Sequence, residues 1–222
     1  MNRRWQLGAG LVLTALAGYV DALGFVRLGG LYTSFMSGNT TQFAVYVGEA
    51  DWNRTLLPLW LVAAFLAGAI LGSVVAIRVP DRWATPSVLA FETILIAAAL
   101  AIGLLSPEPS GASLAIAAAM GAQNAVLARV KGFRAGTTFV TGALFSFGQK
   151  IAEALTRTGS PFGWAGDGVV WLSLLVGALC GALAYQAVNL YALVPPALVA
   201  GLLALITTLI VARAGPAAKV SS

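Results

Sequence analysis

Two carboxylates are the residues of this sequence best suited to chemistry, because both fall inside long apolar stretches. Asp21 lies near the end of the first stretch, and Glu92 lies well inside a later one. A carboxyl group within a membrane is costly and is typical of an ion or proton pathway, or of an acid–base pair. The other interpretations are a buried polar partner for Glu92 and a tie to a neighbouring loop for Asp21.

Two short stretches, 33–48 and 137–148, are rich in threonine, serine and glycine. If each enters the membrane and returns, free backbone N–H groups and positive helix-dipole ends would meet near the midplane. Alternatively, both stretches form Ser/Thr-rich contacts between helices. The candidate solute-binding residues are Asp21, Ser37, Gly38, Asn39, Thr40, Glu92, Gln123, Asn124, Thr137, Thr138, Thr141 and Gly142.

Several function classes are disfavoured by what the sequence lacks. It has no histidine and a single cysteine, Cys180. Zinc sites and Ser/His/Asp catalysis therefore have no residues to build on, and neither a Walker loop nor a GxGxxG loop is present. We expect no enzyme, no cofactor and no metal. The basic residues form short clusters between apolar runs, which is typical of membrane loops rather than of nucleic-acid binding.

The elements that must position these residues are membrane-spanning helices. Apolar residues make up 59% of the 222 positions and charged residues 9%, well below the ~25% charged content of soluble domains. A spanning helix needs about 20 apolar residues. Six stretches qualify, so we expect an all-α polytopic membrane protein: 7–25, 56–77, 86–105, 112–127, 169–188 and 195–211.

The single membrane domain, 1–222, contains an internal repeat. Residues 6–105 form the first copy and 112–212 the second, with offsets of 103, 104 and 109 residues along the match. Chance similarity between apolar helices is the alternative. The recurring pairs include Gly18/Gly121, Asp21/Asn124, Thr33/Thr137, Gly38/Gly142, Gly68/Gly177, Gly72/Gly181 and Pro86/Pro195.

The distribution of basic residues favours six spans with both termini in the cytoplasm. If 33–48 and 137–148 are re-entrant, 11 of the 13 basic residues lie inside and only Arg27 and Arg54 lie outside. If both stretches span, the split is 7 to 6, without the usual cytoplasmic excess. Three spans per copy invert the second copy relative to the first, an arrangement found in many transporters.

The re-entrant geometry predicts where each residue lies. An extended limb, 32–36, would descend and a half-helix from Thr40 to Gly48 would return, with Asn39 as its N-cap. Ser37, Gly38 and Asn39 would then lie near the midplane, opposite Thr141 and Gly142.

Two blocks of the sequence resemble a known family. GYVDALGFVRLGGLYTSFMSGNTTQFA at 18–44 and GAQNAVLARVKGFRAGTTFVTGALFSFGQ at 121–149 are similar to the YoaK family, bacterial membrane proteins assigned to a domain of unknown function. The resemblance covers nearly the whole chain. It implies a small inner-membrane protein and supplies no substrate.

Together these patterns predict a transporter or channel for a small polar solute or ion in the bacterial inner membrane. The alternatives are a non-transporting scaffold or assembly protein and, less favoured, a membrane-embedded enzyme that uses Asp21 and Glu92. The expected partners are membrane lipid and the solute, with no nucleic acid. The Gly68/Gly72 and Gly177/Gly181 faces suggest homo-oligomer contacts.

Overall fold

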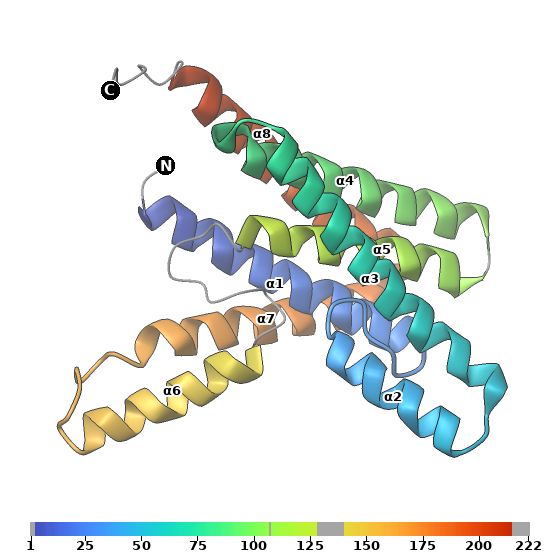
Figure 1. The fold of residues 1–222 in the computed structure, drawn as a ribbon, viewed down its shortest axis with the longest axis horizontal. Coiled ribbons are helices and arrows are strands. Elements are labelled where there is room, and N and C mark those ends of the chain that lie inside the picture. Colours follow the sequence, from blue (N-terminus) through green and yellow to red (C-terminus); the bar gives the residue numbers. More distant parts are fainter. Residues whose placement is uncertain (1–2, 107, 128–139, 215–222) are drawn as a thin grey trace.

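A computed structural model describes residues 3–106, 108–127 and 140–214. It confirms the predicted all-α class: the described residues form α-helices, with one short 3₁₀ helix (Figure 1). The elements are α1 (Arg3–Arg27), α2 (Met36–Gly48), α3 (Trp52–Arg78), α4 (Asp81–Leu105), α5 (Pro109–Leu127), α6 (Val140–Leu155), α7 (Ala165–Val188), η1 (Asn189–Leu193) and α8 (Val194–Arg213).

Within the described part of the chain, four helical stretches are long and apolar enough to cross a membrane: Trp5–Arg27, Trp52–Arg78, Asp81–Leu105 and Ala165–Arg213. The last has 49 residues and would measure roughly 70 Å if it were straight, more than twice a hydrocarbon core of about 30 Å. It is not straight, because Asn189 has a φ of 49° and separates α7 from α8. Each of the six apolar stretches lies in a helix, but six spans remain a prediction.

Helix α1 packs along α7, and α3 packs along α5, through glycines that let the backbones approach closely. A Cβ atom at Gly177 would lie 1.9 Å from the carbonyl oxygen of Ala15, and one at Gly68 would lie 1.9 Å from that of Ala118. Gly72 and Gly181 are equally confined, by Ala122 and Tyr19. Each of these four glycines therefore packs against a neighbouring helix of the same chain. A contact between two copies through these faces stays a prediction.

The contacts of these two helix pairs follow the repeat offsets. A Cβ at Gly18 on α1 would meet the Leu174 carbonyl oxygen of α7 at 2.3 Å. Its counterpart Gly121 on α5 would meet the Phe65 carbonyl oxygen of α3 at 2.0 Å. Phe65 and Leu174 differ by 109 residues, the offset at which Gly68 matches Gly177. Matching positions of the predicted repeat therefore form the closest contacts in both helix pairs. They are Ala15, Gly18, Leu174 and Gly177 between α1 and α7, and Ala118, Gly121, Phe65 and Gly68 between α5 and α3.

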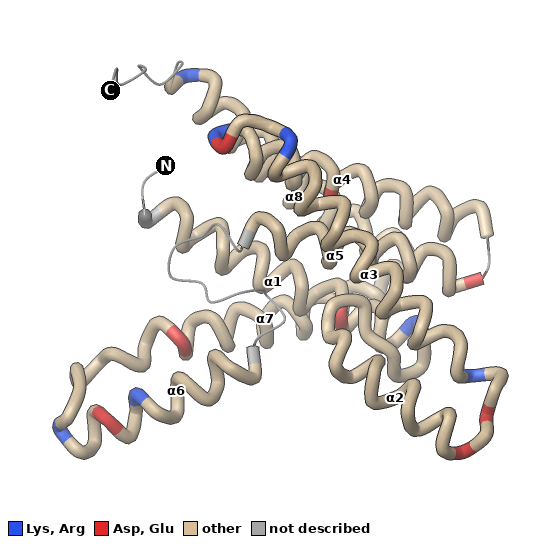
Figure 2. Tube along the Cα trace, in the orientation of Figure 1, with Lys and Arg blue, Asp and Glu red and all other residues tan. Residues whose placement is uncertain are grey.

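Most of the charged residues lie near the ends of the helices (Figure 2). The end of α3, the start of α4 and the end of α8 lie at the same end of the molecule as the start of α1 (Figure 1). Large apolar side chains are exposed along the outer faces of α3, α7 and α8, including Leu66, Ile70, Leu179, Leu183, Leu198 and Leu202. This surface suits contact with lipid chains rather than water.

Candidate functional site

The segment between α1 and α2, residues 28–35, is fastened to α1 by the carboxylate of Asp21. Asp21 Oδ1 accepts hydrogen bonds from the backbone N–H groups of Thr33 (2.9 Å) and Ser34 (2.5 Å), and Oδ2 accepts one from the Ser34 hydroxyl (2.6 Å). The Thr33 hydroxyl donates to the Val20 carbonyl at 3.0 Å. Non-helical backbone at membrane depth needs such partners, and Asp21 supplies them. The structure thus assigns Asp21 the loop-tying role that the sequence left open.

Asn39 fastens the same segment to α2. Its Oδ1 accepts from the Tyr32 N–H at 2.9 Å, and its Nδ2 donates to the Tyr32 carbonyl at 2.7 Å, so one amide replaces a pair of backbone hydrogen bonds. Asn39 is fully buried. The predicted N-cap is wrong: α2 begins at Met36, and Phe35 holds the cap position without a side-chain hydrogen bond. The half-helix is therefore one turn longer than predicted, because the amide pairs with Tyr32 instead of ending the helix.

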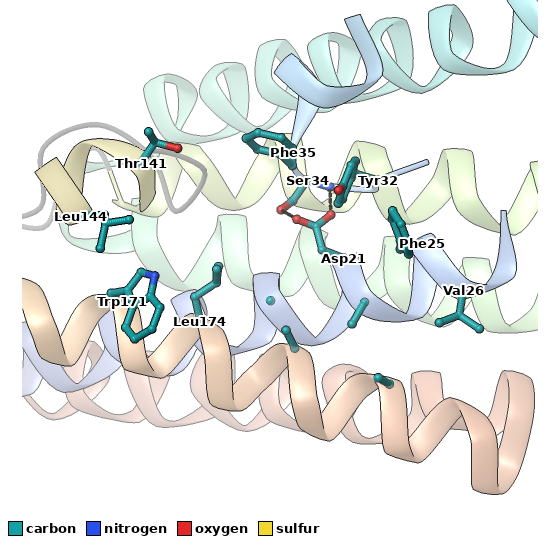
Figure 3. A pocket seen from close by; sticks show the side chains of 14 residues that line it. Asp21, Phe25, Val26, Tyr32, Ser34, Phe35, Thr141, Leu144, Trp171 and Leu174 are labelled. Atoms are coloured by element: carbon teal, nitrogen blue, oxygen red, sulfur yellow. Dashed lines mark hydrogen bonds between the residues drawn. The ribbon is translucent and has the colours of Figure 1, made fainter. Parts of the chain in front are cut away.

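A pocket of about 460 Å³ lies where this segment, α1, α7 and the start of α6 meet. Figure 3 shows Asp21 among the labelled side chains, with Phe25, Tyr32 and Phe35 close by and Thr141, Leu144 and Trp171 farther along the pocket. The floor between these groups is made of small or apolar residues of α1 and α7. Among the described residues that line the pocket, Asp21 is the only charged one.

The pocket is lined by the segment that precedes α2, up to its N-cap residue Phe35, and by the first turns of α6. Helices α2 and α6 run outward in opposite directions (Figure 1). Thr141 lines the pocket from the first turn of α6, and Gly142 follows it as an exposed residue. Two candidates from the second stretch, Thr137 and Thr138, lie outside the described residues.

Three candidates at the start of α2 do not line the pocket. Ser37 and Thr40 are exposed, and the Thr40 hydroxyl donates to the Met36 carbonyl at 2.9 Å within its own helix. Gly38 packs against the rings of Phe35 and Tyr32. A Cβ atom added at Gly38 would lie 2.7 Å from the Phe35 ring and 3.0 Å from the Tyr32 ring. Its role is to let these rings pack against the helix.

Glu92 lies apart from the pocket, between α4 and α5. It is fully buried, and its Oε1 accepts a hydrogen bond from Gln123 Nε2 at 2.8 Å. Its Oε2 has no hydrogen-bond partner among the described residues. Asn124, the next residue along α5, donates to the Met120 carbonyl of its own helix at 2.8 Å. The structure therefore joins Glu92 to Gln123 but does not join either to Asp21.

The aromatic side chains of the pocket were missed by the sequence analysis. Tyr32 packs between Phe25 and Phe35, with ring centroids 5.2 Å away on each side, tilted toward the first and edge-on to the second. Trp171 of α7 lines the pocket farther along. Aromatic residues are common in apolar sequence, so spacing alone did not distinguish them. Their position beside Asp21 could have been inferred only from the path of residues 28–35.

The second short helix, α6, is joined to α7 by an ion pair. Lys150 Nζ of α6 lies 2.6 Å from Asp167 Oδ2 of α7, and both side chains are partly exposed. The rings of Phe147 and Trp164 meet edge to face nearby, with centroids 5.9 Å apart. These contacts fix α6 against α7 beyond the pocket, and so position Thr141 and Leu144 at its rim.

Comparisons with known proteins agree with this architecture. The chain matches the family described as "Protein of unknown function (DUF1275)" over residues 9–206. It is 33% identical over 204 residues to the UPF0700 transmembrane protein RA0705 of Rhizobium meliloti (strain 1021), covering 91% of this chain and 87% of that relative. No solved structure matches. The name YoaK stays a prediction. The chain is a multi-pass membrane protein that belongs to the DUF1275 family.

Proposed function

We propose that this protein is a transporter or channel for a small polar solute or ion. The observation that carries the proposal is the pocket between the non-helical segment that leads into α2 and the first turns of α6, two short helices that run outward in opposite directions. Broken or re-entrant helices are tolerated in membranes where they are buried in protein or line a polar cavity. In secondary transporters such helix starts form the central binding site.

An inverted internal repeat supports the proposal. Each helix of the first half runs opposite to its counterpart in the second half: α1 against α5, α2 against α6, α3 against α7 and α4 against α8 (Figure 1). The closest helix contacts also recur at the repeat offsets, as described for Gly18 and Gly121. Two inverted halves can exchange their arrangements, which is the basis of alternating access.

The proposed orientation has six spans in a bacterial inner membrane, with both termini in the cytoplasm. Arg78, Arg82 and Arg213 belong to the helix ends that lie with the start of α1. Arg54 belongs to the opposite end, at the start of α3. The larger group of basic residues is expected on the cytoplasmic side.

Two other function classes have weaker support. A membrane-embedded enzyme with Asp21 and Glu92 as acid and base would need both in one cavity, and only Asp21 lines the pocket. A scaffold through the glycine faces would need those faces free, whereas they pack within the chain. A scaffold that uses other surfaces stays open as the second candidate.

Uptake by the purified protein in liposomes tests the proposal. We expect uptake of at least one member of a panel containing small cations, anions and neutral polar solutes. We also expect a strong loss in Thr141→Leu, which adds bulk at the pocket rim. Phe145→Leu is the control, because Phe145 lies on the same helix, is 73% exposed and does not line the pocket. Uptake equal to that of empty liposomes across the panel would favour the scaffold.

A further inference from the structure

We propose that the pocket binds a small organic cation, such as an amine or a quaternary ammonium compound. This inference names the substrate class of the proposed transporter and therefore rests on that function. It is drawn from the chemistry of the pocket wall, which combines one acidic group with a group of aromatic rings.

The acidic group is Asp21. Both of its oxygens accept hydrogen bonds: Oδ1 from two backbone N–H groups and Oδ2 from the Ser34 hydroxyl. These donors orient the carboxylate, but none of them carries a positive charge. None of the described residues that line the pocket is Lys or Arg. A cationic ligand would supply the opposite charge that these described lining residues lack.

The aromatic rings suit the same kind of ligand. Phe25, Tyr32, Phe35 and Trp171 all line the pocket, and Figure 3 shows three of them close to Asp21. The faces of aromatic rings attract cations within about 6 Å, and Trp attracts them best. Clusters of aromatic rings bind quaternary ammonium groups in other proteins, because the charge of such a group is spread over methyl groups that cannot donate hydrogen bonds.

The remaining wall excludes the main competitors. A small metal ion needs several oxygen ligands at close range, whereas the polar side chains here are Asp21, Tyr32, Ser34 and Thr141 among mostly apolar neighbours. An anion would meet the carboxylate without a basic partner among these lining residues. The volume, about 460 Å³, lies within the range of about 300 to 1,000 Å³ usual for small-molecule sites.

The test is direct binding to the full chain in detergent or nanodiscs, followed by calorimetry and by tryptophan fluorescence. The probes are choline, tetraethylammonium, the neutral choline isostere 3,3-dimethyl-1-butanol, and acetate. We expect both ammonium probes to bind. Choline should bind at least about tenfold more tightly than its isostere, because it adds one cation–π contact and one charge interaction. Acetate should not bind.

Two kinds of variant locate the site. Trp171→Leu removes a ring and leaves the Asp21 hydrogen bonds intact, so it should weaken choline binding about tenfold. Asp21→Asn should weaken it at least as much; an amide oxygen can still accept from the Thr33 and Ser34 N–H groups, which favours folding. The matched controls are Phe145→Leu and Glu49→Gln, at exposed positions away from the pocket, and both should bind like the original protein.

The outcomes separate this inference from the proposed function. Equal binding of choline and its isostere, tighter binding of acetate, or no binding of either ammonium probe would each overturn the organic-cation site. Choline binding that Trp171→Leu leaves unchanged would also overturn it, by moving the site elsewhere. Ammonium binding without uptake in liposomes keeps the site and refutes transport. Uptake of another solute without ammonium binding keeps transport and refutes the cation.

Discussion

At the scale of single residues, Asp21 and Asn39 have related roles, since each provides hydrogen bonds to the backbone of residues 28–35. Asp21 acts from α1 on Thr33 and Ser34, and Asn39 acts from α2 on Tyr32. Together they hold an irregular segment between two helices in apolar surroundings, where each unpaired backbone group would be costly.

Asn39→Ala should destabilise the protein. It leaves the N–H and C=O groups of Tyr32 without the amide that now pairs with both, and losing such partners costs about 1–3 kcal/mol for each buried group. Thermal unfolding in detergent should show a clearly lower midpoint. Thr40→Val is the control, because the Thr40 hydroxyl is exposed and bonds only within its own helix. Equal midpoints for the two variants would refute the tie.

Glu92 and Gln123 should respond unequally to mutation. Glu92→Gln replaces a buried carboxyl, one oxygen of which has no partner among the described residues, by a neutral amide that is cheaper to bury. We expect unchanged or higher thermal stability. Gln123→Leu removes the donor to Glu92 Oε1 and should destabilise the protein by about 1–3 kcal/mol. A large loss of stability in Glu92→Gln would show that the carboxyl itself is needed for folding.

Composition was enough to select Asp21 and Glu92 as special residues, because charged groups are rare in apolar stretches. It was not enough to assign their partners. The partner of Asp21 depends on the path of residues 28–35, and the partner of Glu92 depends on how α4 meets α5. The hydroxyl groups of Ser37 and Thr40 make them candidates in the sequence, but in the structure both residues are exposed and neither lines the pocket.

At the scale of the elements, helix positions followed from the length of apolar sequence, and the six long stretches all lie in helices. The ends were less predictable. Helix α1 begins at Arg3 and α2 at Met36, before the starts expected at residue 7 and at Thr40. The contacts between elements were predictable only as small-residue patterns: the sequence identifies the glycines, but it does not show which helix of the chain each one packs against.

Glycine-to-alanine substitutions test these contacts. At Gly68 and Gly177 the added Cβ would lie 1.9 Å from a backbone oxygen of the neighbouring helix, so Gly68→Ala and Gly177→Ala should separate the helices and lower thermal stability. Gly148→Ala is the matched control, since nothing lies within 4 Å of its added Cβ. It should leave stability unchanged or raise it by about 0.5–1 kcal/mol, because alanine favours the helix interior. Similar losses at all three positions would contradict the packing.

At the scale of the whole molecule, the two halves combine into one body in which α3 packs on α5 and α1 on α7. Each of these contacts therefore joins a helix of the first half of the chain to a helix of the second half. This arrangement places the pocket between elements of both halves, since α1 comes from the first half and α6 and α7 from the second.

Cysteine labelling tests the proposed orientation of this body. With Cys180 replaced by Ala, single cysteines at Asn53 and Ser106 should react with a membrane-impermeant maleimide on intact cells. Cysteines at Ser160 and Ala214 should react only after permeabilisation. The α6–α7 connection and the end of α8 lie at the end of the molecule where α1 begins (Figure 1). The α2–α3 and α4–α5 connections lie at the other end (Figure 1).

The pattern distinguishes six spans from eight. If α2 and α6 crossed the membrane completely, a cytoplasmic N-terminus would place Asn53 and Ser106 inside, and an external one would place Ser160 and Ala214 outside. Six spans, with α2 and α6 each leaving the membrane on the side from which they approach it, give external labelling at the first pair together with protection at the second. Labelling of all four positions from one side would therefore refute the inverted arrangement of the two halves. It would also refute the alternating access that is proposed to depend on this arrangement.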